Sequence, residues 1–214
     1  MLQKRKKSPK RLKISTSRFN KEIKLIKDGK VGILPTDTLY GLVGSCFSKE
    51  AVNEIYRLKR RNSKKPFIIL ISSLDDLELF NIKISVEEKE LLEKIWPGPV
   101  SAALKINAPG YQYLTRGGKT LAFRLPKPLW LRNFISQSGP LVAPTANFEG
   151  EAPSKSVSDA RAYFDDKVSF YINKGRLTSK PSTLISLENG RVKIIREGAF
   201  DVRGLINKEN NGKF

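Results

Sequence analysis

Residues 31–42 read VGILPTDTLYGL, and this stretch places a strand directly before a polar turn. Residues 31–34 are a short apolar run, which predicts a buried strand ended by Pro35. Upstream, apolar residues recur at helical spacing between 19 and 26, and the pattern stops at Gly29. A helix that feeds a strand is the repeating unit of α/β and α+β domains.

The same alternation continues along the chain. Ser48 is a plausible N-cap for a helix whose apolar face reaches Leu58, and Ser85 with Glu88 forms a capping box at the start of another helix that ends before Pro97. We therefore predict an α/β (α+β) domain with an open, twisted, mixed sheet flanked by helices. The further strands that we expect lie at 67–71, 100–106 and 121–125, with short ones around Leu141, Phe170, Thr183 and Ile194, and a helix opens near Pro128.

Composition excludes several kinds of site. The chain has 214 residues, 39% of them hydrophobic, which is enough for one compact core. It has no histidine and a single cysteine, so histidine triads, histidine metal ligands and cysteine-rich zinc clusters are excluded, and we expect no protein-held metal. No apolar run is long enough for a membrane helix or a signal peptide, so we expect no membrane contact and a cytoplasmic location.

The formal net charge is +19, from 40 basic and 21 acidic residues. Such an excess indicates an anionic partner or, equally well, a surface rich in solvated lysines. Residues 1–16 form a basic stretch, expected to be a flexible tail that either contacts RNA or is simply solvated. We expect the catalytic domain at 17–206 and a second tail at 207–214.

Three polar clusters follow predicted strands or helices, where open α/β sheets collect ligands. Residues 35–41, PTDTLYG, offer two hydroxyls, a carboxylate and a phenol, or form an ordinary turn. Lys59 and Arg61 at a helix end could diverge to hold phosphates, or cap the helix dipole. Thr145 and Asn147, two apart in extended chain, could meet one ligand, or lie in a polar loop.

Taken in order, these segments resemble the YrdC-like threonylcarbamoyl-AMP synthase family, in its short, single-domain form, over roughly residues 18–200. The resemblance includes the PTDTLYGL stretch, the Lys59-Arg-Arg61 element and the Ala143-Pro-Thr-Ala-Asn147 stretch. Four further matches are Trp96-Pro-Gly-Pro99, Thr120-Leu-Ala-Phe-Arg124-Leu-Pro126, Pro181-Ser-Thr183 and Arg196-Glu-Gly-Ala199.

The resemblance implies a nucleotidyltransferase with a YrdC-like fold and a concave basic cleft. Such an enzyme converts L-threonine, bicarbonate and ATP to threonylcarbamoyl-AMP and pyrophosphate, for the threonylcarbamoyladenosine modification of transfer RNA. Mg²⁺ is expected as the counter-ion of the polyphosphate. The implied partners are threonylcarbamoyl-transferase proteins downstream and a contact with tRNA or double-stranded RNA.

The resemblance also implies roles for individual residues. Catalysis is assigned to Lys59, Arg61, Thr145 and Asn147. ATP binding is assigned to Lys59, Arg61, Thr120, Asn147, Ser154 and Arg196. Threonine binding is assigned to Thr36, Thr38, Tyr40, Arg124, Thr145 and Thr183.

Several positions depart from the family pattern. Thr145 stands where serine is usual, and Leu70 stands where many members have a histidine near the threonine. Asn173-Lys-Gly175 replaces a common Asp-Gly-Gly and is given no role. We expect the catalytic domain alone, without the second domain of longer members. The alternative function is a noncatalytic RNA-binding module of the same fold.

Overall fold

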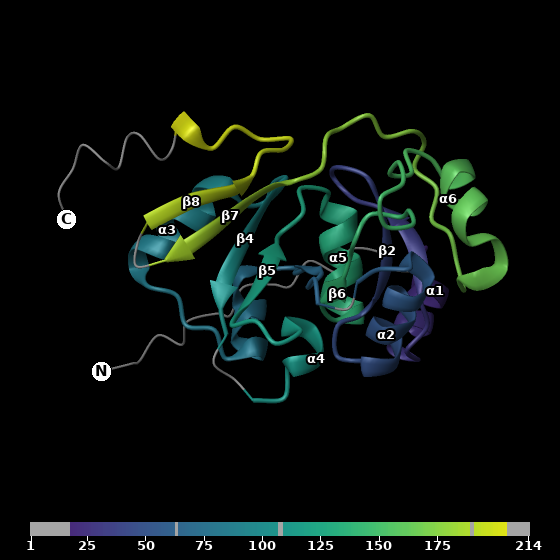
Figure 1. The fold of residues 1–214 in the computed structure, drawn as a ribbon, viewed down its shortest axis with the longest axis horizontal. Helices are drawn as coiled ribbons and strands as arrows, with labels where there is room; N and C mark the ends of the chain where they lie inside the picture. The colour runs from purple at the N-terminus through teal and green to yellow at the C-terminus, as the bar shows by residue number, and fades with distance from the viewer. Residues whose placement is uncertain (1–17, 63, 107–108, 189–190, 205–214) are drawn as a thin grey trace, which may run out of the picture.

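The protein is described by a computed structural model that covers residues 18–204 except 63, 107–108 and 189–190. A single sheet of eight strands runs through it in the order β1-β2-β6-β3-β5-β4-β7-β8 (Figure 1). The expected tails at 1–16 and 207–214 lie outside the described residues. The strands are β1 Gly32–Pro35, β2 Tyr40–Ser45, β3 Ile68–Leu70, β4 Val100–Lys105, β5 Thr120–Arg124, β6 Leu141–Val142, β7 Thr183–Glu188 and β8 Arg191–Arg196.

Strand directions make the sheet mixed. The β3–β5 and β4–β7 pairs are parallel, whereas the β1–β2, β2–β6, β3–β6, β4–β5 and β7–β8 pairs are antiparallel. The predicted fold class, an open mixed sheet flanked by helices, is confirmed. The order is not sequential, so β6 lies between β2 and β3 and brings segments far apart in the chain together.

The helices begin where the caps predict. In α2, Lys49–Lys59, the Ser48 hydroxyl accepts a hydrogen bond from the amide of Ala51. In α3, Val86–Ile95, both hydrogen bonds of the Ser85–Glu88 capping box are present. Each cap satisfies amide groups that the first helical turn leaves without partners. The other helices are α1 Asn20–Lys27, η1 Leu74–Phe80, α4 Gln112–Thr115, α5 Leu129–Ser138, α6 Val157–Phe164 and η2 Asp165–Lys167.

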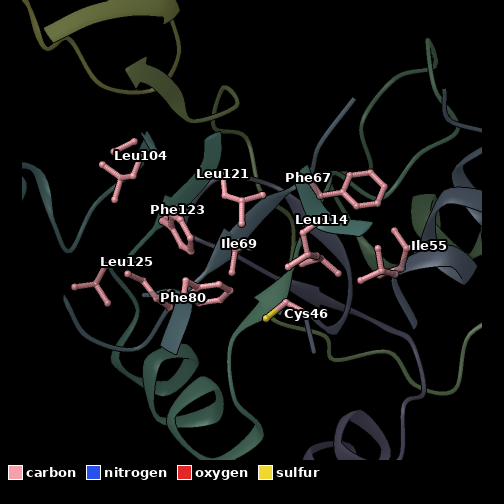
Figure 2. Packing of buried hydrophobic residues seen from close by; sticks show 14 of the residues in the cluster. Cys46, Ile55, Phe67, Ile69, Phe80, Leu104, Leu114, Leu121, Phe123 and Leu125 are labelled. Atoms are coloured by element: carbon pink, nitrogen blue, oxygen red, sulfur yellow. The ribbon is translucent and has the colours of Figure 1, made fainter. Parts of the chain in front are cut away.

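Two apolar clusters cover opposite faces of the sheet. Ile69 and Phe123 contribute to the larger cluster, which Figure 2 shows together with Phe80 from η1 and Leu114 from α4. Residues of α1 and α5 pack on the other face in a smaller cluster that includes Leu70. Because successive side chains of a strand point to opposite faces, β3 can supply both clusters, and burying each large side chain stabilises the fold by about 1.5–3 kcal/mol.

Sequence periodicity missed several elements. The segment taken as a turn after β1 already contains the start of β2, since Tyr40 pairs with Pro35 in a tight hairpin. Short helices such as η1 and α4 have too few residues for a periodic pattern. Phe170 was predicted to lie in a strand, but it stands outside the named strands. Its carbonyl accepts a hydrogen bond from the amide of Ile33, next to an isolated bridge between Ile33 and Tyr171.

Candidate active site

The loop between β1 and β2 is organised by Thr36. Its hydroxyl accepts hydrogen bonds from the amides of Thr38 and Leu39 and donates to the carbonyl of Leu39 at 2.8 Å. The hydroxyls of Thr36 and Thr38 lie 3.0 Å apart. The turn is thus held by side chains of the motif itself, which fixes the direction of the residue between them, Asp37.

Arg124, the last residue of β5, reaches this loop. Its Nη1 donates to the Thr38 hydroxyl at 3.2 Å, and its Nη2 lies 3.5 Å from Asp37 Oδ1. Both side chains are almost fully buried, 5% exposed for Arg124 and 6% for Asp37. Asp37 Oδ2 also accepts from the amide of Lys127, whereas Oδ1 has no hydrogen-bond partner in the protein. We call Thr36, Asp37, Thr38 and Arg124 the Arg124 cluster.

Burial is the main cause of the shifted pKa of Arg124. Loss of hydration lowers the pKa of its guanidinium, the Asp37 carboxylate opposes that shift, and Arg196 adds to it. A buried charge without a partner is costly, so Asp37 compensates the cation that β5 places here.

A second extended segment, residues 143–147, runs beside β2. The amide of Leu42 donates to the Pro144 carbonyl at 2.9 Å, and the amide of Ala146 donates to the Tyr40 carbonyl at 2.8 Å. An isolated bridge joins Gly41 to Thr145. These contacts attach the segment that carries Thr145 and Asn147 to β2, which directly follows the loop with Thr36, Asp37 and Thr38.

Lys59 is held by this second segment. It is the last residue of α2, and its side chain is buried, with 1% exposure. Its Nζ donates to the carbonyls of Thr145 and Asn147 at 2.6 and 2.7 Å and to Asn147 Oδ1 at 3.2 Å. The Thr145 hydroxyl also donates to Asn147 Oδ1, at 2.6 Å. An ammonium has three N–H groups, so these oxygens use its whole donor capacity.

Burial and a neighbouring cation act on Lys59. Loss of hydration, followed by repulsion from Arg61, lowers the pKa of the Lys59 amine to about 7, while Glu149 opposes the shift. The carboxylate of Glu149 accepts hydrogen bonds from the amide of Asn62 and from the Lys65 amine, at 2.8 and 3.0 Å. The carboxylate that acts on the pKa of Lys59 is thus bonded to other residues.

Arg61 lies just beyond the helix end. Arg60 takes the left-handed conformation at the C-cap, with φ of 52°, and turns the chain between the two cations. The guanidinium of Arg61 is 5.3 Å from the centre of the Phe67 ring, and its buried Nε has no hydrogen-bond partner. We call Lys59, Arg61, Thr145 and Asn147 the Lys59 cluster.

Arg196 links the two clusters. Its charge lowers the pKa of Arg124, and its own pKa is lowered by burial and then by the charge of Arg61. Arg196 Nη2 donates to the Ser182 carbonyl at 2.8 Å, and the Ser182 hydroxyl lies 3.0 Å from that of Ser101 on β4. Gly198 lies two residues further on, and no side chain would fit there because a Cβ would lie 2.3 Å from the Pro181 carbonyl.

The face of β4 and β5 that carries Arg124 has small side chains beside it. Ala122 pairs with Ala103, both are partly exposed, and alternation puts them on the same face as Arg124. Neither apolar cluster contains them. A flat ligand group could therefore lie against β4 and β5 beside Arg124.

The other predicted site residues lie around these clusters. Thr120 is on the same face as Arg124 but at the opposite end of β5, about 13 Å along the strand. The Ser154 hydroxyl bonds to the Ala146 carbonyl and so supports the 143–147 segment. Tyr40 is fully buried, and its hydroxyl donates to the Gly175 carbonyl at 2.6 Å.

The hydroxyl of Thr183 is hydrogen-bonded within the protein. Its hydroxyl donates to the Phe200 carbonyl at 2.5 Å and accepts from the Phe200 amide at 3.1 Å. It therefore fastens the segment after β8 to the start of β7, at the same edge as Ser182 and Arg196.

Sequence reasoning left three polar residues of this site without a role. Asp37 lies inside the PTDT motif, so its position was a usable signal, but only the structure pairs its carboxylate with Arg124. Ser182 lies inside the Pro181-Ser-Thr183 match, so its position was also a usable signal, whereas no pattern marks Glu149. In the part of the chain that the structure describes, no group of three or more Asp, Glu, Cys or His side chains could hold a metal ion. None of the described helices is long and apolar enough to cross a membrane.

Comparison with known proteins identifies the family of the chain. Residues 24–198 match the family model Sua5/YciO/YrdC, described as "Telomere recombination". A putative threonylcarbamoyl-AMP synthase of Methanocaldococcus jannaschii is 30% identical over 183 residues, which are 85% of this chain and 86% of that protein. A threonylcarbamoyl-AMP synthase of Pyrococcus abyssi is also 30% identical, over 82% of this chain and 52% of its own length.

A solved structure extends the comparison to three dimensions. The crystal structure of P. abyssi Sua5 complexed with L-threonine superposes with a TM-score of 0.83 at 28% identity. The match covers 90% of this chain and 57% of that one, so this chain spans a little over half the length of the P. abyssi protein.

Proposed function

The chain belongs to the Sua5/YciO/YrdC family, and we propose that it is a threonylcarbamoyl-AMP synthase, a nucleotidyltransferase that uses L-threonine, bicarbonate and ATP. The single observation that carries this proposal is the continuous set of contacts between the Arg124 cluster and the Lys59 cluster. That set would place an amino acid beside a nucleotide. The chemistry needs this proximity because both substrates end up in one molecule.

The reaction has two steps. The threonine amine loses its proton and forms a bond to the bicarbonate carbon, and water leaves, which gives a carbamate. A carbamate oxygen then attacks the α-phosphorus of ATP, the bond to the oxygen bridging to the β-phosphate breaks, and pyrophosphate leaves. Positioning and charge stabilisation can supply much of the rate for such a reaction, so the lack of histidine is no obstacle.

We assign Arg124 to the carboxylate of threonine and Arg61 with Arg196 to the phosphates. A guanidinium can bind a carboxylate or a phosphate through two parallel hydrogen bonds. The hydroxyls of Thr36, Thr38 and Thr145 would line the region where the carbamate forms. Thr120, at the far end of β5, would meet the nucleoside part of ATP, and Ser154, Tyr40 and Thr183 would hold the surrounding segments in place.

For Lys59 we propose a positioning role beside the ATP-binding and catalytic roles that its motif suggests. We propose that it orients Thr145 and Asn147, since its three donors are used by their oxygens. Its charge would still favour the polyphosphate, and a bound anion would raise its lowered pKa.

We propose that Mg²⁺ enters together with ATP as part of the substrate. The two carboxylates at the site are already engaged, Asp37 beside Arg124 and Glu149 with Lys65. The donors present therefore suit a metal held mainly by phosphate oxygens and water.

The product is an adenylate that can diffuse, so we propose that it passes to threonylcarbamoyl-transferase proteins, which complete the modification of tRNA. These substrates are those of the cytoplasm, which is the location we propose. Direct contact with tRNA or double-stranded RNA stays a prediction, and weakening of binding as salt rises would reveal phosphate contacts.

The test is mass spectrometry of the purified protein incubated with threonine, bicarbonate and ATP. We expect threonylcarbamoyl-AMP and pyrophosphate, and neither when threonine or bicarbonate is omitted. ATP turnover that is equal with and without threonine would refute the proposal. A folded protein that binds RNA but makes no adenylate would favour the noncatalytic alternative.

A further inference from the structure

The cations of the site are unequally matched by carboxylates. After the larger effect of burial, the charge of Arg61 lowers the pKa of Arg196, and the charge of Arg196 lowers the pKa of Arg124. Glu149, whose charge acts on the pKa of Lys59, is bonded to Lys65, and its side chain is 27% exposed. Asp37 alone is buried within the site, 3.5 Å from Arg124.

Asp37 does not saturate Arg124 with hydrogen bonds. Its Oδ1 is close enough for a strong charge interaction but has no hydrogen-bond partner in the protein. Arg124 donates one hydrogen bond, from Nη1 to Thr38, and its Nε also lacks a partner. The pair is therefore balanced in charge while both members keep hydrogen-bonding capacity.

We infer that Asp37 is a specificity-determining residue that makes the Arg124 position accept an amino acid and reject simple anions. An unbalanced buried guanidinium attracts any small anion, including bicarbonate, phosphate and pyrophosphate. With Asp37 beside it, an incoming carboxylate alone meets a like charge. A ligand that carries an ammonium next to its carboxylate meets an opposite charge for each of its own groups.

The proposed function, on which this inference rests, explains why such selectivity would be needed. The enzyme must hold an amino acid close to bicarbonate and to a triphosphate, and both of these are anions. If the Arg124 cluster does not bind bicarbonate or phosphate, it stays available for threonine. The Lys59 cluster, which lacks a carboxylate partner of this kind, remains the place for phosphates.

The test measures binding by calorimetry without ATP, so it does not depend on synthase activity. In the unmodified protein, excess phosphate should leave threonine affinity unchanged, and 3-hydroxybutanoate, which keeps the carboxylate and hydroxyl of threonine but lacks the amine, should not compete. In Asp37→Asn, threonine affinity should fall about tenfold, and both anions should compete with threonine.

Two further variants sharpen the result. Asp28→Asn is the matched control, because it removes one exposed carboxylate paired with Lys24 and changes the net charge equally. It should behave as the unmodified protein. Asp37→Glu keeps the charge, so it should still exclude phosphate even where its longer side chain weakens threonine binding.

Phosphate exclusion that survives in a folded Asp37→Asn variant would overturn the inference. If that variant does not fold, competition by 3-hydroxybutanoate in the unmodified protein would overturn it equally. Failure of the proposed function looks different, since the unmodified protein would then bind no threonine or form no adenylate.

Discussion

The Arg124 cluster and the Lys59 cluster hold their buried cations in opposite ways. Arg124 has a carboxylate 3.5 Å away, whereas Lys59 is held by two carbonyls and an amide oxygen and has Arg61 as its cationic neighbour. Charge is cancelled in the first cluster and left in excess in the second. The difference suggests how one site can bind a zwitterion at the Arg124 cluster and a polyphosphate at the Lys59 cluster, without either ligand binding in the place of the other.

The largest expected effect on stability comes from removing one of the two opposite charges of the Arg124 cluster. Arg124→Gln leaves the Asp37 carboxylate buried without its cation, and we expect the free energy of unfolding to fall by about 3–5 kcal/mol. Adding Asp37→Asn should restore much of that loss, because neither charge then remains. Urea unfolding of the two single variants and the double variant measures this coupling. Additive losses would show that the two side chains do not balance each other.

The next effect separates the two cations of the Lys59 cluster. Lys59→Met leaves three oxygens without their donor, so we expect a loss of about 2–3 kcal/mol in unfolding free energy. Arg61→Met is the matched control, since no hydrogen bond of the Arg61 side chain would be lost, and its loss should stay below about 1 kcal/mol. Equal destabilisation by both changes would contradict the positioning role of Lys59.

The smallest effect is a pH dependence. The pKa of Lys59 is about 7 in the folded protein and about 10.4 in an unfolded chain. Between these values the unfolded state binds more protons, so stability should rise with pH, by at most about 1.4 kcal/mol per pH unit. Urea unfolding at several pH values should show this rise in the unmodified protein and not in Lys59→Met.

That measurement has a defined window. Burial raises the pKa of the Cys46 thiol, so above about pH 8.5, where the thiol of an unfolded chain ionises, Cys46 adds a slope of the opposite sign. The comparison therefore belongs between about pH 7 and pH 8.5. An identical slope in both proteins would show that Lys59 has an ordinary pKa.

The sequence predicted the fold where local signals are strong. Ser48 and the Ser85–Glu88 box mark helix starts because the capping groups are local in sequence, and the alternation from Val100 onward marks β4. It could not predict that β6 separates β2 from β3, since strand order depends on contacts between distant segments.

The site shows the same division. Motifs picked out Lys59, Arg124 and Asn147, and the structure assigns their contacts. The use of all three Lys59 donors by residues 86 and 88 positions away could not be read from spacing. The pairing of Asp37 with Arg124 likewise depends on how the β1–β2 loop meets the end of β5.

The most direct test of the account is calorimetric titration of threonine and of ATP into the unmodified protein, Arg124→Gln and Arg61→Gln. We predict that Arg124→Gln loses threonine binding and keeps ATP binding, whereas Arg61→Gln weakens ATP binding and keeps threonine binding. Variants that remain folded yet weaken both ligands equally, or neither, would contradict the division of the site into a balanced and an unbalanced cluster.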